Sequence, residues 1–343
     1  MDLIYMNADR EDIGVMKEFS LDLAFGADEN DFECTVSRNM HCCKERYYLY
    51  IEGTEYGGVI DDIESDTDAD EVKYHGRSWQ GFLDIKCILP LQQGEKSENG
   101  VTLKLLDADQ NSYVDRYLIV SGEANNILSW MINRVGLEGL FSASTVNSGI
   151  YVEQFQFDRY CMAYAGICKM LKSCGAKLKL DFQNGKVVLH AESIKDYSKD
   201  EQFDSDLISL KVKRYYKPVN HLICLGQGDL EERQIIHLYA DEEGSISHSQ
   251  SLMGTDEIVQ VYDYPSVESL EELEKGGIEK LQEAWNQDHI SIGLDSDQES
   301  FDIGDVVGAV DQVTGMEGKA EITKKIVTIN NEDITISYEV GED

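Results

Sequence analysis

The clearest folding signal in the chain is the segment LKLDFQNGKVVL at residues 178–189. Apolar and polar residues alternate on both sides of its centre, as they do in half-buried strands. The central Asn184-Gly185 pair readily adopts the positive φ angles of a two-residue type I′ turn. The segment therefore predicts a β-hairpin.

Two amphipathic helical patterns precede the hairpin. The apolar residues on one face of the first helix are Ile127, Leu128, Met131, Ile132 and Val135. Ser121 is its expected N-cap and Gly136 its expected end. The apolar residues of the second helix are Tyr160, Tyr164, Ile167, Leu171 and Cys174. Asp158 is expected to cap this helix and Gly175 to end it. The two helices and the hairpin together predict a compact α/β unit.

Strand patterns lie on both sides of this unit. Toward the N-terminus they are Leu21–Phe25, Phe32–Val36, Tyr47–Ile51 and Val72–Tyr74. Toward the C-terminus they are Leu210–Val212, Val219–Leu225, Ile235–Leu238, Phe301–Val307, Ala320–Ile322 and a hairpin of Ile326–Ile329 with Ile334–Tyr338 around Asn330-Asn331. Several short strands separated by turns favour a barrel or a sandwich. A helical pattern after Pro265 interrupts the C-terminal strands. The pair Gly276-Gly277 weakens this helix by about 1 kcal/mol per glycine relative to alanine, and we expect a kink there.

These patterns predict an α+β, mainly β fold in four segments. A first β domain covers residues 1–92, and an α/β domain covers 93–204. A second β domain is formed by 205–245 and 290–343, and 246–289 is a smaller, helix-containing insertion. The length agrees with this division, because 343 residues correspond to two or three domains of about 150 residues each.

Acidic residues dominate the charge of the chain. It contains 66 Asp and Glu against 30 Lys and Arg, a formal net charge of −36. Because nucleic-acid-binding proteins neutralise phosphates with Lys and Arg, this composition argues against tight binding of DNA or RNA. An acidic wall would, however, let DNA slide past without sticking. The alternative is that the acidity only maintains solubility.

The eight cysteines lack the spacing of metal-binding knuckles, and we expect them to be reduced. They are Cys34, Cys42, Cys43, Cys87, Cys161, Cys168, Cys174 and Cys224. Met1–Glu11 contains no apolar signal-peptide core, and no run approaches the roughly 20 apolar residues of a membrane span. We therefore expect a soluble product of the cytoplasm with no membrane insertion.

Two segments together resemble a known family. The first is VKYHGRSWQGFL at residues 72–83, followed by Ile88-Leu89-Pro90. The second is FDIGDVVGA at residues 301–309, which continues to Ile322 and Lys325-Ile326. In this order, with an α/β unit between them and a helix before the second, they resemble the baseplate-hub and tail-hub family of tailed phages, including prophage tail proteins of Gram-positive bacteria. In these hubs a stretch similar to Tyr74–Ser78 closes the first barrel.

The resemblance implies that both β domains are barrels of the tail-tube type and that the chain is a virion structural protein. Three copies would form a homotrimer, whose six similar barrels make a pseudo-hexameric ring closed by cyclic symmetry. The implied partners are a tail tube or distal tail protein on one side and a tail spike or fibre on the other. DNA would pass through without tight binding. The implied location is the virion tail, assembled in the bacterial host cytoplasm. Because the sequence ends at Asp343, we expect any lysin or fibre to be a separate protein, unless the sequence is truncated.

The acidic run Asp66–Asp70 looks at first like a calcium loop. An EF-hand loop that begins at Asp66 needs Gly at its sixth position and Glu at its twelfth, where this chain has Glu71 and Arg77. We interpret the run as a solvated acidic loop.

The triplet His41-Cys42-Cys43 could carry a metal or a nucleophilic thiolate. Adjacent residues of a strand point to opposite faces, and no second ligand pair lies at a workable spacing. A buried or half-buried strand is the preferred interpretation.

No other motif indicates catalysis. The remaining histidines are His75, His190, His221, His237, His248 and His289, and they fit no zinc-hydrolase pattern. Gly226-Gln227-Gly228 is too short to cradle a phosphate. Trp79, Trp130 and Trp285 could bind sugar, but the last two lie in helical patterns and are expected in the core. We expect no catalytic, cofactor-binding or metal-binding residues, no cofactor and no enzymatic activity.

The leading hypothesis is therefore a structural tail hub. An alternative is a glycan-binding or cell-wall-degrading module at the tail tip, which would need aromatic platforms or a carboxylate pair with a raised pKa. A weaker alternative is an intracellular scaffold unrelated to phages.

Overall fold

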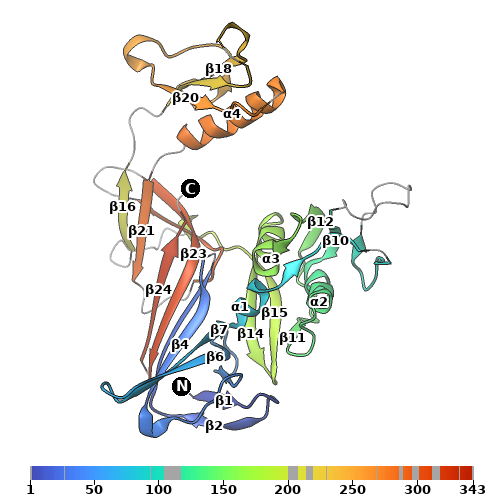
Figure 1. Ribbon diagram of the computed structural model, residues 1–343, viewed down its shortest axis with the longest axis vertical. Helices are drawn as coiled ribbons and strands as arrows, with labels where there is room; N and C mark the ends of the chain where they lie inside the picture. Colours follow the sequence, from blue (N-terminus) through green and yellow to red (C-terminus); the bar gives the residue numbers. More distant parts are fainter. Residues whose placement is uncertain are drawn as a thin grey trace. The chain divides into compact units, whose positions relative to one another are not determined.

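The computed structural model describes residues 2–26, 28–92, 94–103, 117–199, 208–213, 219–228, 230–267, 269–285, 289–295, 301–310, 317–331 and 333–341 (Figure 1). The chain divides into two compact units. Unit 1 comprises Met1–Ser209, Ile292–Val310 and Lys319–Gly341, and unit 2 comprises Leu210–Ser291, Asp311–Gly318 and Glu342–Asp343. Two strands, β16 (Ile208–Lys213) and β21 (His289–Asp295), lie where the chain passes from one unit to the other.

The main sheet of unit 1 joins strands from both ends of the chain. Its order is β16-β21-β24-β23-β3-β4-β7-β6-β5-β1-β2, with β22 paired to β23. The bounds are β1 (Leu3–Met6), β2 (Asp12–Met16), β3 (Ser20–Gly26), β4 (Asn30–Ser37), β5 (Tyr48–Tyr50), β6 (Gly57–Asp66), β7 (Glu71–Ser78), β22 (Val306–Val310), β23 (Glu317–Asn330) and β24 (Asp333–Val340). The chain is thus mainly β, as the sequence predicts.

Strict alternation makes these segments strands with one buried face. In β3 the buried residues are Leu21, Leu23 and Phe25, and β4 and β7 show the same period of two. Val327 and Ile329 of β23 enter the same core. The predicted C-terminal hairpin is confirmed, and it turns at Asn331, which has a φ of 57°.

The C-terminal hairpin extends the N-terminal sheet. Ile326 pairs with Ala24 and Ile329 pairs with Leu21. Residues 292–310 and 319–341 therefore belong to the same compact unit as residues 1–209. The sequence pattern instead predicts that 290–343 belong to a separate β domain. Across the described residues no sheet closes into a barrel, so the two-barrel architecture remains a prediction.

The α/β part of unit 1 packs helices against small sheets. Its elements are α1 (Trp79–Asp84), β8 (Cys87–Ile88), β9 (Thr102–Leu103), β10 (Ile119–Glu123), α2 (Ala124–Arg134), β11 (Phe141–Ala143), β12 (Tyr151–Gln156), β13 (Cys161–Met162), α3 (Ala163–Lys172), β14 (Ala176–Gln183) and β15 (Lys186–Ser193). The pairings are β12-β10-β9, β11-β15-β14 and β13-β8. In Figure 1, α2 and α3 lie beside the β14–β15 hairpin, against which both pack. The hairpin is confirmed, with φ angles of 52° at Asn184 and 77° at Gly185.

The predicted helix ends are right and the predicted caps are wrong. Gly136 and Gly175 follow α2 and α3 with φ angles of 72° and 71°. The carboxylate of Glu123, not the hydroxyl of Ser121, accepts the N–H of Asn126 at the start of α2. The Ser121 hydroxyl instead accepts the N–H of Gln154. Helix α3 has no side-chain cap, and Asp158 forms an ion pair with Lys169.

Unit 2 is a four-stranded sheet covered by one helix. The sheet order is β19-β18-β17-β20, with β17 (His221–Leu225), β18 (Ile235–Ala240), β19 (Ile246–Ser247), β20 (Val259–Asp263) and α4 (Leu270–Trp285). The helix runs without interruption through Gly276-Gly277, and a Cβ added at Gly277 would lie 2.5 Å from the Cys224 sulfur. Glycine there allows α4 to pack closely against β17.

Candidate functional site

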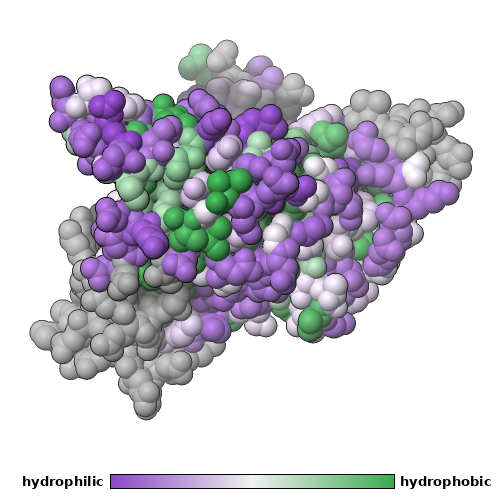
Figure 2. All heavy atoms as spheres, turned by 90° about the horizontal axis from the view of Figure 1, so that it is seen from below, coloured by the Kyte–Doolittle hydropathy of each residue, from purple (hydrophilic) through white to green (hydrophobic). Residues whose placement is uncertain are grey.

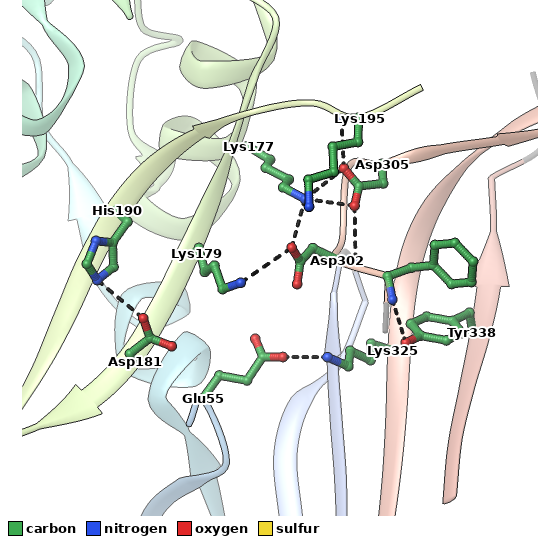
Figure 3. Close-up of polar contacts among 11 residues, drawn as sticks. Glu55, Lys177, Lys179, Asp181, His190, Lys195, Asp302, Asp305, Lys325 and Tyr338 are labelled. Atoms are coloured by element: carbon green, nitrogen blue, oxygen red, sulfur yellow. Dashed lines mark hydrogen bonds and ion pairs between the residues drawn. The ribbon is translucent and has the colours of Figure 1, made fainter. Parts of the chain in front are cut away.

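A buried ionic cluster joins the β14–β15 hairpin to the segment that leads into β22 (Figure 3). The Lys177 ammonium lies 2.7 Å from both oxygens of Asp305 and 2.8 Å from Asp302 Oδ2. The side chains of Lys177 and Asp305 are only 2% and 1% exposed. Asp305 also accepts the backbone N–H groups of Lys195 and Asp302. The cluster therefore satisfies each of its charges inside the protein.

The geometry of this cluster indicates a structural role. An ammonium group has three protons, and the three short contacts of Lys177 use them all. Its burial alone would lower the pKa of Lys177, but the hydrogen bonds that Lys177 donates to Asp302 and Asp305 outweigh this and raise the pKa. Burial would likewise raise the pKa of Asp302, but Lys177 holds it below the usual range. Because Lys177 is kept charged and has no free lone pair, it is unsuited to act as a nucleophile or base.

A second buried ion pair lies beside the first. Figure 3 shows Lys325 of β23 pointing toward Glu55, and its ammonium lies 2.7 Å from Glu55 Oε1. Lys325 is 3% exposed and sits against the rings of Phe25 and Tyr56. Burial would lower the pKa of Lys325, yet the charge of Glu55 raises it. Two buried lysines thus fix the C-terminal segments of unit 1 to its remainder.

The outward face of the main sheet carries a concentration of carboxylates, which we name the acidic face. It forms a depression of about 620 Å³, whose charged lining residues are Asp22, Glu29, Asp31, Glu33, Asp61, Asp62, His75 and Arg77. Six carboxylates against one arginine give a formal charge of −5 when His75 is neutral. Figure 2 shows the surface of the molecule from below the view of Figure 1, and most of the coloured residues on it are hydrophilic.

The strand register places like charges next to each other on the acidic face. Asp22 lies directly opposite Glu33 in the β3–β4 pair. Directly opposed like charges destabilise a sheet, so the stability of the fold does not explain this pair. Burial raises the pKa of Asp31, and the charge of Glu29 raises it further. The charged form of Asp31 is therefore maintained at a cost in stability.

Three basic groups on this sheet offset part of the charge, and one of them, Lys324 of β23, pairs with Glu29. Arg77 makes a bidentate pair with Asp61 at 2.6 and 2.7 Å. Lys73 donates to Glu33 at 2.8 Å, and this hydrogen bond lowers the pKa of Glu33. Because all three bases are already paired with protein carboxylates, they are poorly placed to bind phosphate.

The run Asp66–Asp70 forms the tip of the β6–β7 ribbon. Asp66 accepts the N–H groups of Asp68 and Ala69 at 2.7 and 3.0 Å, and these bonds lower its pKa. The carboxylate stabilises a turn, in agreement with the predicted acidic loop. In the described part of the chain, no three His, Cys, Asp or Glu side chains are close enough to hold a metal ion together.

The triplet His41-Cys42-Cys43 does not form the predicted strand. It lies in an irregular segment between β4 and β5. The Tyr74 hydroxyl accepts the N–H groups of Cys42 and Cys43 at 3.1 and 3.4 Å, so a side chain takes the place of a strand partner. Cys43 is buried and Cys42 is exposed.

The tryptophans do not form sugar-binding platforms. Trp79 is fully buried and stacks on Phe182, and Trp130 is 8% exposed beneath Arg134. Trp285 packs against the core of unit 2. The prediction that Trp130 belongs to the core is confirmed, whereas Trp285 is half-buried at the edge of the unit 2 core.

Sequence reasoning missed both the ionic cluster and the pattern of the acidic face. Lys177 lies 125 and 128 positions from its two aspartates, so no local spacing could have linked them. The outward positions of Asp22 and Glu33 do follow from the alternation in β3 and β4, but their pairing requires the register. Among the described helices, none combines the length and apolar character that a membrane span needs.

Comparisons with known proteins identify a similar fold. No protein-family model matches the sequence, and no curated protein matches it. The prophage tail protein gp18 from Listeria monocytogenes EGD-e has a TM-score of 0.50 at 10% identity, covering 100% of this chain and 95% of that one. The 43 kDa tail protein of prophage MuSo2 from Shewanella oneidensis has a TM-score of 0.50 at 10% identity, covering 100% of this chain and 98% of that one. The chain therefore has, over its whole length, a fold similar to that of two prophage tail proteins.

Proposed function

We propose that the protein is a structural subunit of a phage or prophage tail. The observation that carries this proposal is the similarity of the fold to two prophage tail proteins across nearly the full length of all three chains. The structure of unit 1 supports a mechanical role, because buried ion pairs join segments that are far apart in the sequence.

Within the tail, we propose the position of the hub at the distal end of the tube. The two segments that resemble tail hubs support this position. In this proposal three copies form a pseudo-hexameric ring that joins the tail tube to a spike or fibre. The subunit has no enzymatic role, and its function resides in its interfaces and in the wall of the channel.

The acidic face supplies the chemistry of that wall. Its six carboxylates would repel a passing phosphate backbone and its bases are already paired, so that DNA slides along it without being gripped. A wall that attracted phosphates would instead slow the ejection of DNA, because counterions would be exchanged at each contact between wall and phosphate.

The oligomeric state tests the hub proposal. Three copies carry a formal charge of 3 × −36 = −108, so repulsion weakens the free trimer at low ionic strength and moderate salt screens it. Sedimentation across a salt series, with negative-stain projections, should show a threefold ring that is favoured by added salt. A particle that stays monomeric at high concentration in every salt contradicts the ring.

A further inference from the structure

Two adjacent thiols lie in the irregular segment between β4 and β5. The Cys42 and Cys43 sulfur atoms are 3.8 Å apart. The Tyr74 hydroxyl accepts hydrogen bonds from the backbone N–H groups of Cys42 and Cys43, and it also lies 3.0 Å from His41 Nδ1. Because Tyr74 is fully buried in β7, the two thiols are attached to a rigid part of the sheet.

The surroundings of Cys42 favour its thiolate form. The hydrogen bond from the Cys43 thiol lowers the pKa of Cys42 to about 7, and hydrogen bonds from Tyr5 and Tyr74 add to this against the opposing effect of burial. The same contact with Cys42, together with burial, raises the pKa of Cys43. The pair is therefore asymmetric: Cys42 ionises before Cys43, and about half of it is thiolate at neutral pH.

Other cysteines of the chain have the opposite character. Burial raises the pKa of Cys168 to about 12 and that of Cys224 to about 11. Cys42, by contrast, is exposed and lines a hollow of about 270 Å³ together with Tyr5, Val15 and Met40. A small reagent can thus reach the thiolate, since reactivity of a cysteine follows its thiolate fraction and its access.

We propose that Cys42 and Cys43 form a redox-active dithiol that reacts with low-molecular-mass disulfides. The Cys42 thiolate attacks one sulfur of the disulfide, forms a mixed disulfide and releases the other half as a thiolate. That thiolate takes up the proton of Cys43, and the Cys43 sulfur then attacks Cys42. This step forms the Cys42–Cys43 disulfide and releases the second half as a thiolate, which is protonated by solvent. The protein loses two electrons and the small disulfide gains them.

The separation of the two sulfurs permits the resolving step. A disulfide bond is about 2.05 Å long, so the two sulfurs must approach by less than 2 Å from their present separation of 3.8 Å. A bond between adjacent residues is strained and is therefore easily reduced again. The segment thus acts as a reversible redox site, and not as a permanent cross-link.

Oxidised glutathione and the full-length chain provide the test, with intact mass and peptide mapping as the readout. Wild type should lose two hydrogens, contain a Cys42–Cys43 disulfide and retain no glutathione. The C43A variant should retain one glutathionyl group at Cys42, and C42S should retain none at residue 43. The exposed Cys87 offers a matched control, because C87S should behave as wild type.

A second measurement needs no variant. Limited alkylation of reduced wild type at neutral pH should modify Cys42 at least tenfold faster than Cys87. Equal or faster alkylation of Cys87 overturns the proposal. Retention of a glutathionyl group at Cys42 by wild type, to the same extent as by C43A, also overturns it.

Discussion

Replacing Lys177 by Met tests the buried ionic cluster of unit 1. The substitution keeps much of the side-chain length but removes the cation that neutralises Asp305 and Asp302. The Asp305 side chain is 1% exposed and the Asp302 side chain 18% exposed, so water cannot replace the lost ammonium at Asp305. Breaking a buried pair by removing one partner costs about 3–5 kcal/mol, because the other charge stays buried. We expect K177M to lower the free energy of unfolding by that amount.

Thermal and urea unfolding measure this loss. A domain of 150–250 residues loses roughly 2–4 °C in Tm per kcal/mol, so the transition of unit 1 should fall by about 6–20 °C. The matched control is K169M, which removes an ion pair whose two side chains are each 65% exposed and should leave the transition unchanged. A K177M variant as stable as K169M would refute the reasoning about burial.

Four further predictions follow from particular contacts. In α4, G277A should destabilise unit 2 by about 1–3 kcal/mol, because the added Cβ would lie 2.5 Å from the Cys224 sulfur. The added Cβ of G276A would lie 3.2 Å from the Tyr262 hydroxyl, at the end of a side chain, so this variant should stabilise the helix by up to about 1 kcal/mol. Urea unfolding of the two variants measures the difference. The pKa of Asp302 is lowered in the folded chain, so its contribution to stability is present above the unfolded pKa of about 3.9 and is lost as the pH falls through the folded pKa. The D302N variant should therefore show a weaker loss of unfolding free energy at acid pH than wild type. An unchanged dependence of the unfolding free energy on pH would contradict this. On the acidic face, the double substitution D22K and E33K changes the formal charge from −5 to −5 + 4 = −1 and should weaken the repulsion of duplex DNA, whereas wild type should show no DNA binding in fluorescence anisotropy at any salt concentration. Finally, adding salt should strengthen the trimer, and tighter association on removing salt would contradict the charge argument.

Local patterns predicted most of the elements that depend on neighbouring residues. The Asn184-Gly185 turn and the helix ends at Gly136 and Gly175 are confirmed, because positive φ angles are an intrinsic preference of these residues. The caps were wrong for a different reason. Helix α2 begins at Ala124, so Glu123 and not Ser121 holds the N-cap position, and the Ser121 hydroxyl instead accepts the N–H of Gln154 on β12.

Features that depend on distant residues could not be predicted. The pairing of β23 with β3 and the contacts of Lys177 with Asp302 and Asp305 join positions that are more than one hundred residues apart. The segment around Cys42 was expected to be a strand, but the hydroxyl of Tyr74 takes the hydrogen bonds that a strand partner would take. Periodicity describes which face of an element is buried and contains no information about its partner.

Purified tail particles provide the most direct test of the structural role. The phage or prophage that encodes the chain would be induced, its tails isolated by density gradient, and their proteins identified by mass spectrometry with and without an in-frame deletion of this gene. The account predicts that the chain is present in tails in multiples of three copies and that the deletion abolishes complete tails. Normal tails in the deletion strain, or the absence of the chain from purified particles, would contradict it.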